Sequence, residues 1–141
     1  MNKFFVGPGE TVMHKGDLLT GVKIPYPKPD SGTAFVKLGR TNLDIATVNA
    51  AVNFRIVDNL LQDVRIVVGA VAPVPKKMDA VEKFLEGKSP SLQIYEYASE
   101  YCCDFIKPIT DIRASADYRL KVTKALVNDA LVKAWSRVKG E

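Results

Sequence analysis

Two long segments rich in valine and isoleucine, residues 45–57 and 60–71, constrain the fold more than any other feature of this sequence. The pair between them, Asp58-Asn59, tolerates the left-handed backbone that tight hairpin turns require. Within each segment apolar residues recur at every second position, which is the period of a strand with one buried face. We therefore predict an antiparallel hairpin with an apolar face that needs a cover.

A third strand is predicted to begin at Thr33, where apolar residues alternate with others as far as Leu38. Pro73 and Pro75 are expected to end the sheet, because a proline has no N–H to donate to a β-ladder. The sheet predicted from the sequence therefore has three antiparallel strands.

The remainder of the chain is predicted to be helical. A short helix over residues 79–85 would stop at Gly87, which can supply a left-handed cap. Ser89 is expected to cap a second helix, with Pro90 as its first residue, and Ser115 to cap a third that carries a broad apolar stripe. Strands followed by helices indicate an α+β fold, in which about three helices cover one face of the sheet.

Length and composition favour an ordinary globular chain of 141 residues, 47% hydrophobic and 26% charged. Glycines and prolines punctuate residues 1–32 so densely that only short extended pieces fit, such as residues 18–24. We therefore expect residues 1–32 to be a linker or the end of a preceding region, and residues 33–141 to form the α+β domain.

The sequence also indicates the cellular compartment of the protein. No apolar run approaches the roughly 20 residues of a membrane helix, and we find no secretory signal, so we expect a cytoplasmic protein that does not enter membranes. Cys102 and Cys103 are adjacent, which suits neither a disulfide framework nor a zinc site, so we interpret them as buried thiols.

The formal net charge of +4 gathers in residues 1–40 and 120–141. No zinc-finger spacing, RNP-like strand or glycine-rich clamp accompanies it, so a solvated basic face is favoured over a nucleic-acid site. A basic nucleic-acid binder stays open as an alternative, with affinity falling steeply as salt rises.

No self-sufficient catalytic set is evident from the residues. His14, the single histidine, is interpreted as a surface residue. Asp111 and Arg113, with Asp117 and Arg119, place charges around the start of the last predicted helix, where capping and surface pairing explain them. Phosphate-binding glycine fingerprints are absent, so the Gly-Pro-Gly at residues 7–9 is interpreted as a turn.

Several strings in order along the chain resemble the FAD-binding, or medium, subunit of molybdenum hydroxylases, the family of aerobic carbon monoxide dehydrogenase and xanthine dehydrogenase. The strings are Phe4-Phe5-Val6-Gly7-Pro8-Gly9-Glu10-Thr11, Gly16-Asp17-Leu18-Leu19, Val36-Lys37-Leu38-Gly39-Arg40, Asp44-Ile45-Ala46-Thr47-Val48-Asn49, Gly69-Ala70-Val71-Ala72-Pro73-Val74-Pro75 and Asp111-Ile112-Arg113-Ala114-Ser115-Ala116-Asp117-Tyr118-Arg119. The resemblance extends from about Phe4 to Arg137.

The resemblance implies a C-terminal domain that covers one side of a flavin site, with the family's FAD-contact positions on Leu19 and Lys37. It implies FAD as cofactor, but only together with an N-terminal FAD domain that this chain lacks. The implied partners are that FAD-binding domain, a molybdenum-containing large subunit and an iron–sulfur small subunit, with electrons passing between them. No catalysis and no metal site are expected from this chain alone.

Three further expectations follow. The isolated chain should bind FAD weakly or not at all, because two side chains cannot supply the binding free energy for a dinucleotide. The segment from Ala72 to Lys77 is a candidate docking surface, with a plain sheet-to-helix connection as the alternative. The alternative function is a stand-alone interaction or dimerisation domain, which would form a homo-oligomer.

Overall fold

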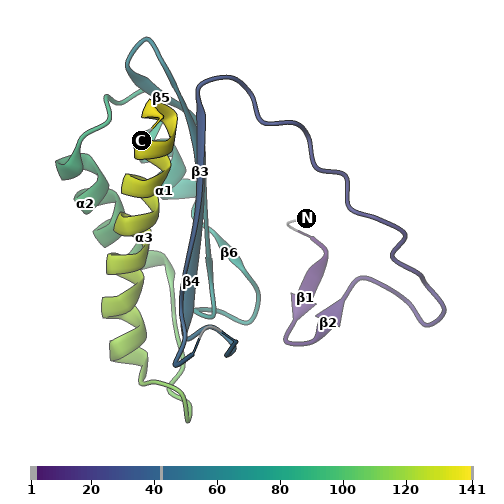
Figure 1. Cartoon of the computed structure of the whole chain (residues 1–141). Helices are drawn as coiled ribbons and strands as arrows, with labels where there is room; N and C mark the ends of the chain where they lie inside the picture. Colours follow the sequence, from purple (N-terminus) through teal and green to yellow (C-terminus); the bar gives the residue numbers. More distant parts are fainter. Residues whose placement is uncertain (1–2, 42, 141) are drawn as a thin grey trace.

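The computed structural model describes residues 3–41 and 43–140 (Figure 1). Helices cover one face of a sheet, and residues 3–30 form an N-terminal arm on the opposite side. In chain order the elements are β1 (Phe5–Gly7), β2 (Glu10–Thr11), β3 (Ser31–Leu38), β4 (Val48–Val57), β5 (Leu60–Gly69), β6 (Lys76–Lys77), α1 (Asp79–Leu85), α2 (Leu92–Cys102), a 3-10 turn (Cys103–Phe105) and α3 (Ala116–Lys139).

The predicted hairpin forms the centre of the sheet. β4 and β5 pair antiparallel, and Val57 lies opposite Leu60 at the turn. Asp58 and Asn59 both have positive φ, at 52° and 60°, as a two-residue turn between right-twisted strands requires. β4 begins at Val48, later than the predicted segment. β3 pairs with the outer side of β4, so the three expected strands are all present.

The α+β class and the helical cover on one face are confirmed, but the main sheet has four strands in the order β3-β4-β5-β6. The expectation that Pro73 and Pro75 end the sheet was wrong. Both prolines lie in the loop after β5, where neither has to donate a ladder hydrogen bond. The chain then turns back, and Lys76 and Lys77 pair with β5 as the short strand β6.

The cap of α2 also differs from the prediction. Ser91, not Ser89, is the N-cap, and its hydroxyl accepts a hydrogen bond from the Ile94 N–H at 3.2 Å. The Lys88 carbonyl accepts a hydrogen bond from the Leu61 N–H at 2.8 Å, which holds the preceding residues along β5. The chain therefore turns into the helix two residues later than the serine–proline pair suggested.

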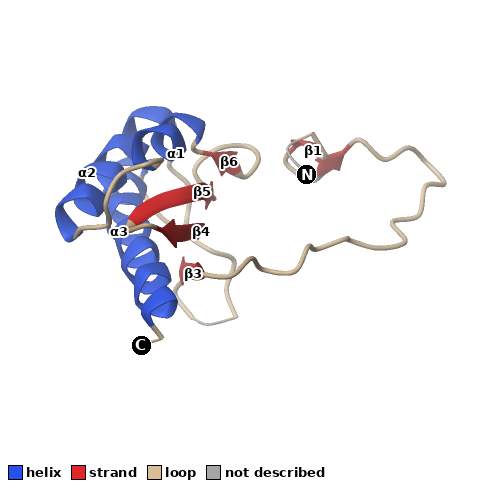
Figure 2. Cartoon of the chain, turned by 90° about the horizontal axis from the view of Figure 1, so that it is seen from above, coloured by secondary structure: helices blue, strands red, loops and turns tan. Residues whose placement is uncertain are grey.

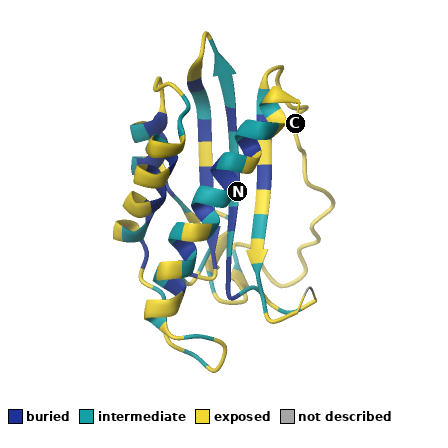
Figure 3. Cartoon of the chain, turned by 60° about the vertical axis from the view of Figure 1, so that its left-hand side comes forward, coloured by how far each residue is buried: buried dark blue, intermediate teal, exposed yellow. Residues whose placement is uncertain are grey.

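The core lies between the sheet and the helices (Figure 3). It takes the alternate apolar residues of β4 and β5 together with the apolar stripe of α3. Its largest fully buried side chains are Tyr95, Phe54, Leu61, Ile66, Met78, Leu85, Leu131, Val48, Val52, Val64, Val68 and Val71. Gly32 on β3 lets α3 approach closely, because a Cβ there would overlap the carbonyl oxygen of Ala134.

Two carboxylates of the α1 region close the outer edge of β5. Glu82, which is buried, accepts a hydrogen bond from the Ile66 N–H at 2.9 Å. Glu86 accepts from the N–H groups of Asp63 and Val64 at 2.9 and 3.2 Å. Backbone donors on an exposed strand edge would otherwise be open to pairing with another chain, so α1 protects this edge.

The N-terminal arm leads away from the sheet and returns to it at β3 (Figure 2). Its first residues form the small hairpin β1–β2, with the predicted turn at Pro8 and Gly9. Residues 18–24 lie outside any strand. Near β3 the arm is held by the Lys28–Asp63 ion pair at 2.8 Å and by the Arg55 Nε, which donates to the Pro29 carbonyl at 3.2 Å.

Candidate functional site

Lys37 lies near the end of β3 and is exposed. The alternation along β3 buries Ala34 beneath the helices and leaves Phe35, two residues before Lys37, 62% exposed on the uncovered face. Lys37 shares that face with its partner in register, Asn49 on β4. Its ammonium group donates a hydrogen bond to the backbone carbonyl of Asp44 at 2.9 Å, so it is held against the β3–β4 loop.

Leu19 lies in the N-terminal arm and is 56% exposed. It lines an apolar hollow of about 710 Å³ between the hairpin β1–β2 and the returning arm. The lining residues are Lys3, Phe4, Phe5, Val12, Leu19, Gly21, Val22, Lys23, Ile24 and Pro25. All of these residues belong to the arm, so the hollow has no wall from the sheet.

The structure does not bring Leu19 and Lys37 into one pocket. Leu19 faces the hollow within the arm, whereas Lys37 projects from the sheet near the β3–β4 loop. Figures 1 and 2 both show the arm standing away from the sheet. The two residues therefore cannot enclose a ligand by themselves, and their role as FAD contacts stays a prediction.

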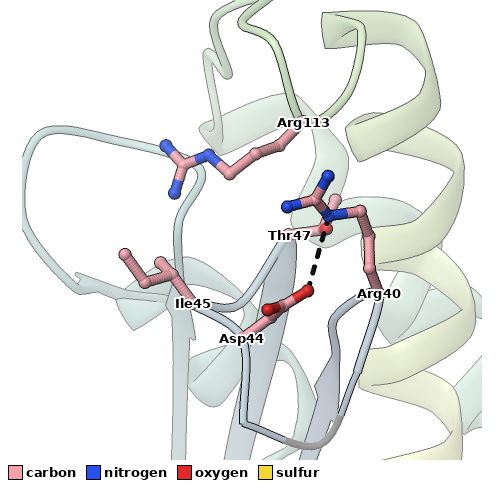
Figure 4. Close-up of a pocket in the computed structure, with 5 residues that line it drawn as sticks. All are labelled: Arg40, Asp44, Ile45, Thr47 and Arg113. Atoms are coloured by element: carbon pink, nitrogen blue, oxygen red, sulfur yellow. Dashed lines mark ion pairs between the residues drawn. The ribbon is translucent and has the colours of Figure 1, made fainter.

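A second pocket, of about 150 Å³, lies at the end of the sheet where β3 and β4 are joined (Figure 4). It is lined by Arg40, Asp44, Ile45, Thr47 and Arg113. The Nε of Arg40 lies 3.4 Å from the Asp44 carboxylate, which also accepts a hydrogen bond from the Thr41 N–H. Arg113 reaches the same pocket from the segment before α3.

A cluster of ion pairs around the buried Arg119 lies behind this pocket. Arg119, in the first turns of α3, is only 2% exposed and donates to the carbonyls of Thr47 and Ala70 and to the Asp111 carboxylate. Asp111 also accepts from the backbone and side chain of Arg113. These hydrogen bonds, those from Arg113 first, hold the pKa of Asp111 well below its usual range.

The expectation that capping and surface pairing explain these charges was wrong for Arg119. Its guanidinium ties the start of α3 to the loops at the ends of β3 and β5. A signal was present in the sequence, because Arg119 stands at helical spacing before Thr123 and Val127, which are also buried. The capping serine Ser115 was predicted correctly, and its hydroxyl accepts from the Tyr118 N–H.

The remaining candidates from the sequence are His14 and the two cysteines. His14 is exposed, and the Asp17 carboxylate accepts from its backbone N–H. Burial raises the pKa of the Cys102 thiol to about 12, while Cys103 is half-buried. Within residues 3–41 and 43–140, no group of three or more metal-ligating side chains is present, and no helix is long and apolar enough to cross a membrane.

The segment from Ala72 to Lys77 is partly exposed, as a docking surface requires. However, the ammonium group of Lys77 already pairs with Asp79 and, at 3.1 Å, with Glu82. These partners raise the pKa of Lys77, the hydrogen bond to Asp79 contributing most. The segment therefore offers less free positive charge than its sequence suggested, and its docking role stays a prediction.

Comparisons with known proteins give a consistent result. The family described as the CO dehydrogenase flavoprotein C-terminal domain matches residues 33–134. The carbon monoxide dehydrogenase medium chain of Hydrogenophaga pseudoflava is 28% identical over 95% of this chain and 47% of its own length. The nicotine 6-hydroxylase medium subunit of Paenarthrobacter nicotinovorans is 32% identical over 94% of this chain and 46% of its own length.

Solved structures agree. A carbon monoxide dehydrogenase of Hydrogenophaga pseudoflava, described as lacking the Mo-pyranopterin moiety of the molybdenum cofactor, superimposes with a TM-score of 0.91 at 29% identity, over 96% of this chain and 47% of the matched chain. A quinoline 2-oxidoreductase of Pseudomonas putida gives a TM-score of 0.87 at 28% identity, over 98% of this chain and 47% of the matched chain. The chain thus spans about half the length of the proteins it matches.

Proposed function

This chain belongs to the CO dehydrogenase flavoprotein C-terminal domain family, and from that premise we propose that it is the C-terminal domain of the FAD-binding subunit of a molybdenum-containing oxidoreductase. Its role is to close one side of the flavin site and to dock on partner subunits during electron transfer. The observation that carries the proposal is the sheet face left uncovered by helices, on which Lys37 and Phe35 are exposed.

The uncovered face supports the proposal because no helix packs on it and Phe35 lies 62% exposed there, two residues before Lys37. The helices bury the other face completely enough to form a core, so the open face is available for a second domain. The division into a linker over residues 1–32 and a domain over residues 33–141 fits this arrangement. The matched family begins at residue 33, and the helical core packs against strands from Ser31 onward.

Bound FAD would supply electron transfer between a molybdenum centre and an acceptor. Lys37 would place its ammonium group against an anionic or carbonyl group of the cofactor, and the Asp44 carbonyl fixes its direction at 2.9 Å. Leu19 would pack its side chain against a ring, and its apolar neighbours in the arm would exclude water. Because Lys37 and Leu19 lie in separate places, the rest of the site must come from an FAD-binding domain.

The partners follow from the same proposal. They are an FAD-binding domain, a molybdenum-containing large subunit and an iron–sulfur small subunit, of the kind implied for relatives named as medium chains. We place the chain in the cytoplasm, where the free thiols Cys102 and Cys103 would stay reduced. No observation favours nucleic acid as a partner.

The test is reconstitution of a flavin site from two pieces. The chain is mixed with a separately expressed FAD-binding region encoded in the same genome, and the mixture is followed by size-exclusion chromatography and by its flavin absorption spectrum. We expect co-elution and a shifted flavin spectrum, and Lys37→Ala should weaken the shift. The chain alone should bind FAD no tighter than millimolar, because it lacks a pyrophosphate-binding loop.

The matched control is Lys121→Ala, which removes an exposed lysine from α3 on the helical side of the molecule. It should leave both co-elution and spectrum unchanged. A chain that elutes alone as a stable oligomer, without any spectral change, would instead support a stand-alone interaction or dimerisation domain. Micromolar binding of FAD to the isolated chain would contradict the dependence on a second domain.

A further inference from the structure

We propose that the pocket between the β3–β4 loop and the segment before α3 binds a phosphate-class oxyanion, held between the guanidinium groups of Arg40 and Arg113. The two arginines come from distant parts of the sequence and meet at one pocket of about 150 Å³. That volume suits a single tetrahedral oxyanion with its first waters rather than a large organic ligand. The proposal does not depend on the flavin role of Lys37.

The guanidinium groups keep donors for a ligand. In the described part of the chain, Arg40 uses only its Nε, at 3.4 Å from Asp44, and no hydrogen bond engages its two Nη atoms. Arg113 uses its Nε and Nη2 on Asp111, at 3.0 and 2.6 Å, and leaves Nη1 without a partner among the same residues. Planar guanidinium donors of this kind match the oxygen spacing of phosphate and carboxylate groups.

The charges around the pocket favour an anion. Among residues 3–41 and 43–140, the ion-pair partners of Arg40, Arg113 and the buried Arg119 are the two carboxylates of Asp44 and Asp111. Lys37 adds a further positive charge close by, since its ammonium group is bonded to the Asp44 carbonyl. The surplus of positive charge in a partly enclosed hollow gives a positive electrostatic potential that attracts an anion to the space between the two guanidinium groups.

The Arg113 side of the pocket is also held in position before any ligand arrives. Asp111 fixes the direction of Arg113 and is itself fixed by Arg119, whose second contact is the carbonyl of the pocket residue Thr47. Figure 4 shows Arg113 reaching over the loop while Arg40 faces Asp44. Side chains already held in position lose less conformational entropy when a ligand binds.

Asp44 links this pocket to Lys37. Its carboxylate lies against Arg40, and its backbone carbonyl accepts the hydrogen bond from the Lys37 ammonium group. An oxyanion that draws Arg40 away from Asp44 would therefore loosen the loop that holds Lys37. Binding of an oxyanion at Arg40 and Arg113 should therefore change the hydrogen bond between Lys37 and the Asp44 carbonyl.

The test is an NMR titration of the whole chain with inorganic phosphate at low ionic strength, following the arginine Nε–Hε signals. We expect saturable shifts at Arg40 and Arg113 with a dissociation constant of about 1–10 mM, since only two charge-assisted contacts are made. Arg40→Gln and Arg113→Gln should each weaken binding about tenfold, and added chloride should weaken it in the wild type. Absence of saturation, or affinity unchanged in either variant, would overturn the proposal.

The matched control is Arg65→Gln, which removes an exposed arginine on β5 that lines a different groove. This variant should bind phosphate as tightly as the wild type does. A loss of affinity equal to that of Arg40→Gln or Arg113→Gln would show that general surface charge, not the pocket, determines phosphate binding. Comparing adenosine monophosphate with inorganic phosphate identifies the source of the phosphate group, and adenosine is the control without one. Tighter binding of the monophosphate than of inorganic phosphate indicates a phosphate ester, whereas equal binding of the two indicates a free oxyanion.

Discussion

The guanidinium of Arg119 donates a hydrogen bond to the backbone carbonyl of Thr47 at 2.6 Å, across 72 residues of sequence. The same Nη1 donates to the Ala70 carbonyl at 3.0 Å, and Nη2 pairs with Asp111 at 2.7 Å. One buried side chain thus joins α3 to the ends of two strand segments. Its Nε has no partner among the described residues, so the group retains part of its desolvation cost.

We predict that Arg119→Met destabilises the chain by about 3 kcal/mol, because the buried Thr47 carbonyl, the partly buried Ala70 carbonyl and the Asp111 carboxylate each lose a hydrogen bond at once. Denaturant unfolding followed by circular dichroism measures the change. Arg113→Met is the matched control, since it removes the more exposed partner of the same Asp111 and should cost under about 1 kcal/mol. An equal loss of unfolding free energy in the two variants would show that the burial of Arg119 does not determine its contribution to stability.

Asp111 gives a second prediction, on pH. Its pKa is lowered in the folded chain, the backbone N–H of Arg113 contributing first, so its contribution to stability is complete above the ordinary pKa of 3.8. The contribution is lost as the pH falls below that value toward the lowered pKa. The difference in unfolding free energy between the wild type and Asp111→Asn should therefore be constant from about pH 5 to 7 and shrink below about pH 4.

The measurement is urea unfolding of both proteins at intervals between pH 2.5 and 7. Asp63 and Asp79 also have lowered pKa values, owing first to Lys28 and to Lys77 respectively, but both are present in each protein and cancel in the difference. A difference that grows as the pH falls would contradict the assignment.

Short sequence patterns correctly predicted those parts of the fold that depend on neighbouring residues in the chain. The Asp58-Asn59 turn, the Ser115 cap and the α+β class all follow from short-range rules of backbone conformation and periodicity. Tertiary contacts decided the rest. Ser91 replaces Ser89 as a cap because Lys88 is bound to β5, and β6 forms because the chain returns along an edge that needs a partner.

The site was harder to predict for a physical reason. Arg40 and Arg113 form a pocket only after the sheet and α3 have packed, so neither spacing nor composition indicates it. Lys37 and Leu19 were singled out through family resemblance, and this chain on its own leaves them apart. The proposed flavin site would divide its residues between two domains, so one domain alone could not form it.

Gly32 gives a third prediction. A Cβ at this position would overlap the Ala134 carbonyl oxygen on α3 and approach Val138 to 2.7 Å. Gly32→Ala should therefore push α3 off the sheet and destabilise the chain by about 2–3 kcal/mol, with a lower melting temperature. Gly21→Ala is the control, because nothing lies within 4 Å of its Cβ position, and we expect no loss there. Equal melting temperatures for the two variants would contradict the close packing of α3.

Cys102 gives a fourth prediction, on thiol reactivity. Burial raises the pKa of Cys102 to about 12, and burial also raises that of Cys103, whose Sγ lies near the Ser99 and Leu120 carbonyls. Because the thiolate is the reactive form, Cys102 should not react with a disulfide reagent at pH 8 in the folded chain, and Cys103 should react slowly. Denaturant should release both thiols. Cys103→Ser leaves Cys102 as the single thiol, so rapid labelling of this folded variant would show that the buried region around Cys102 opens readily.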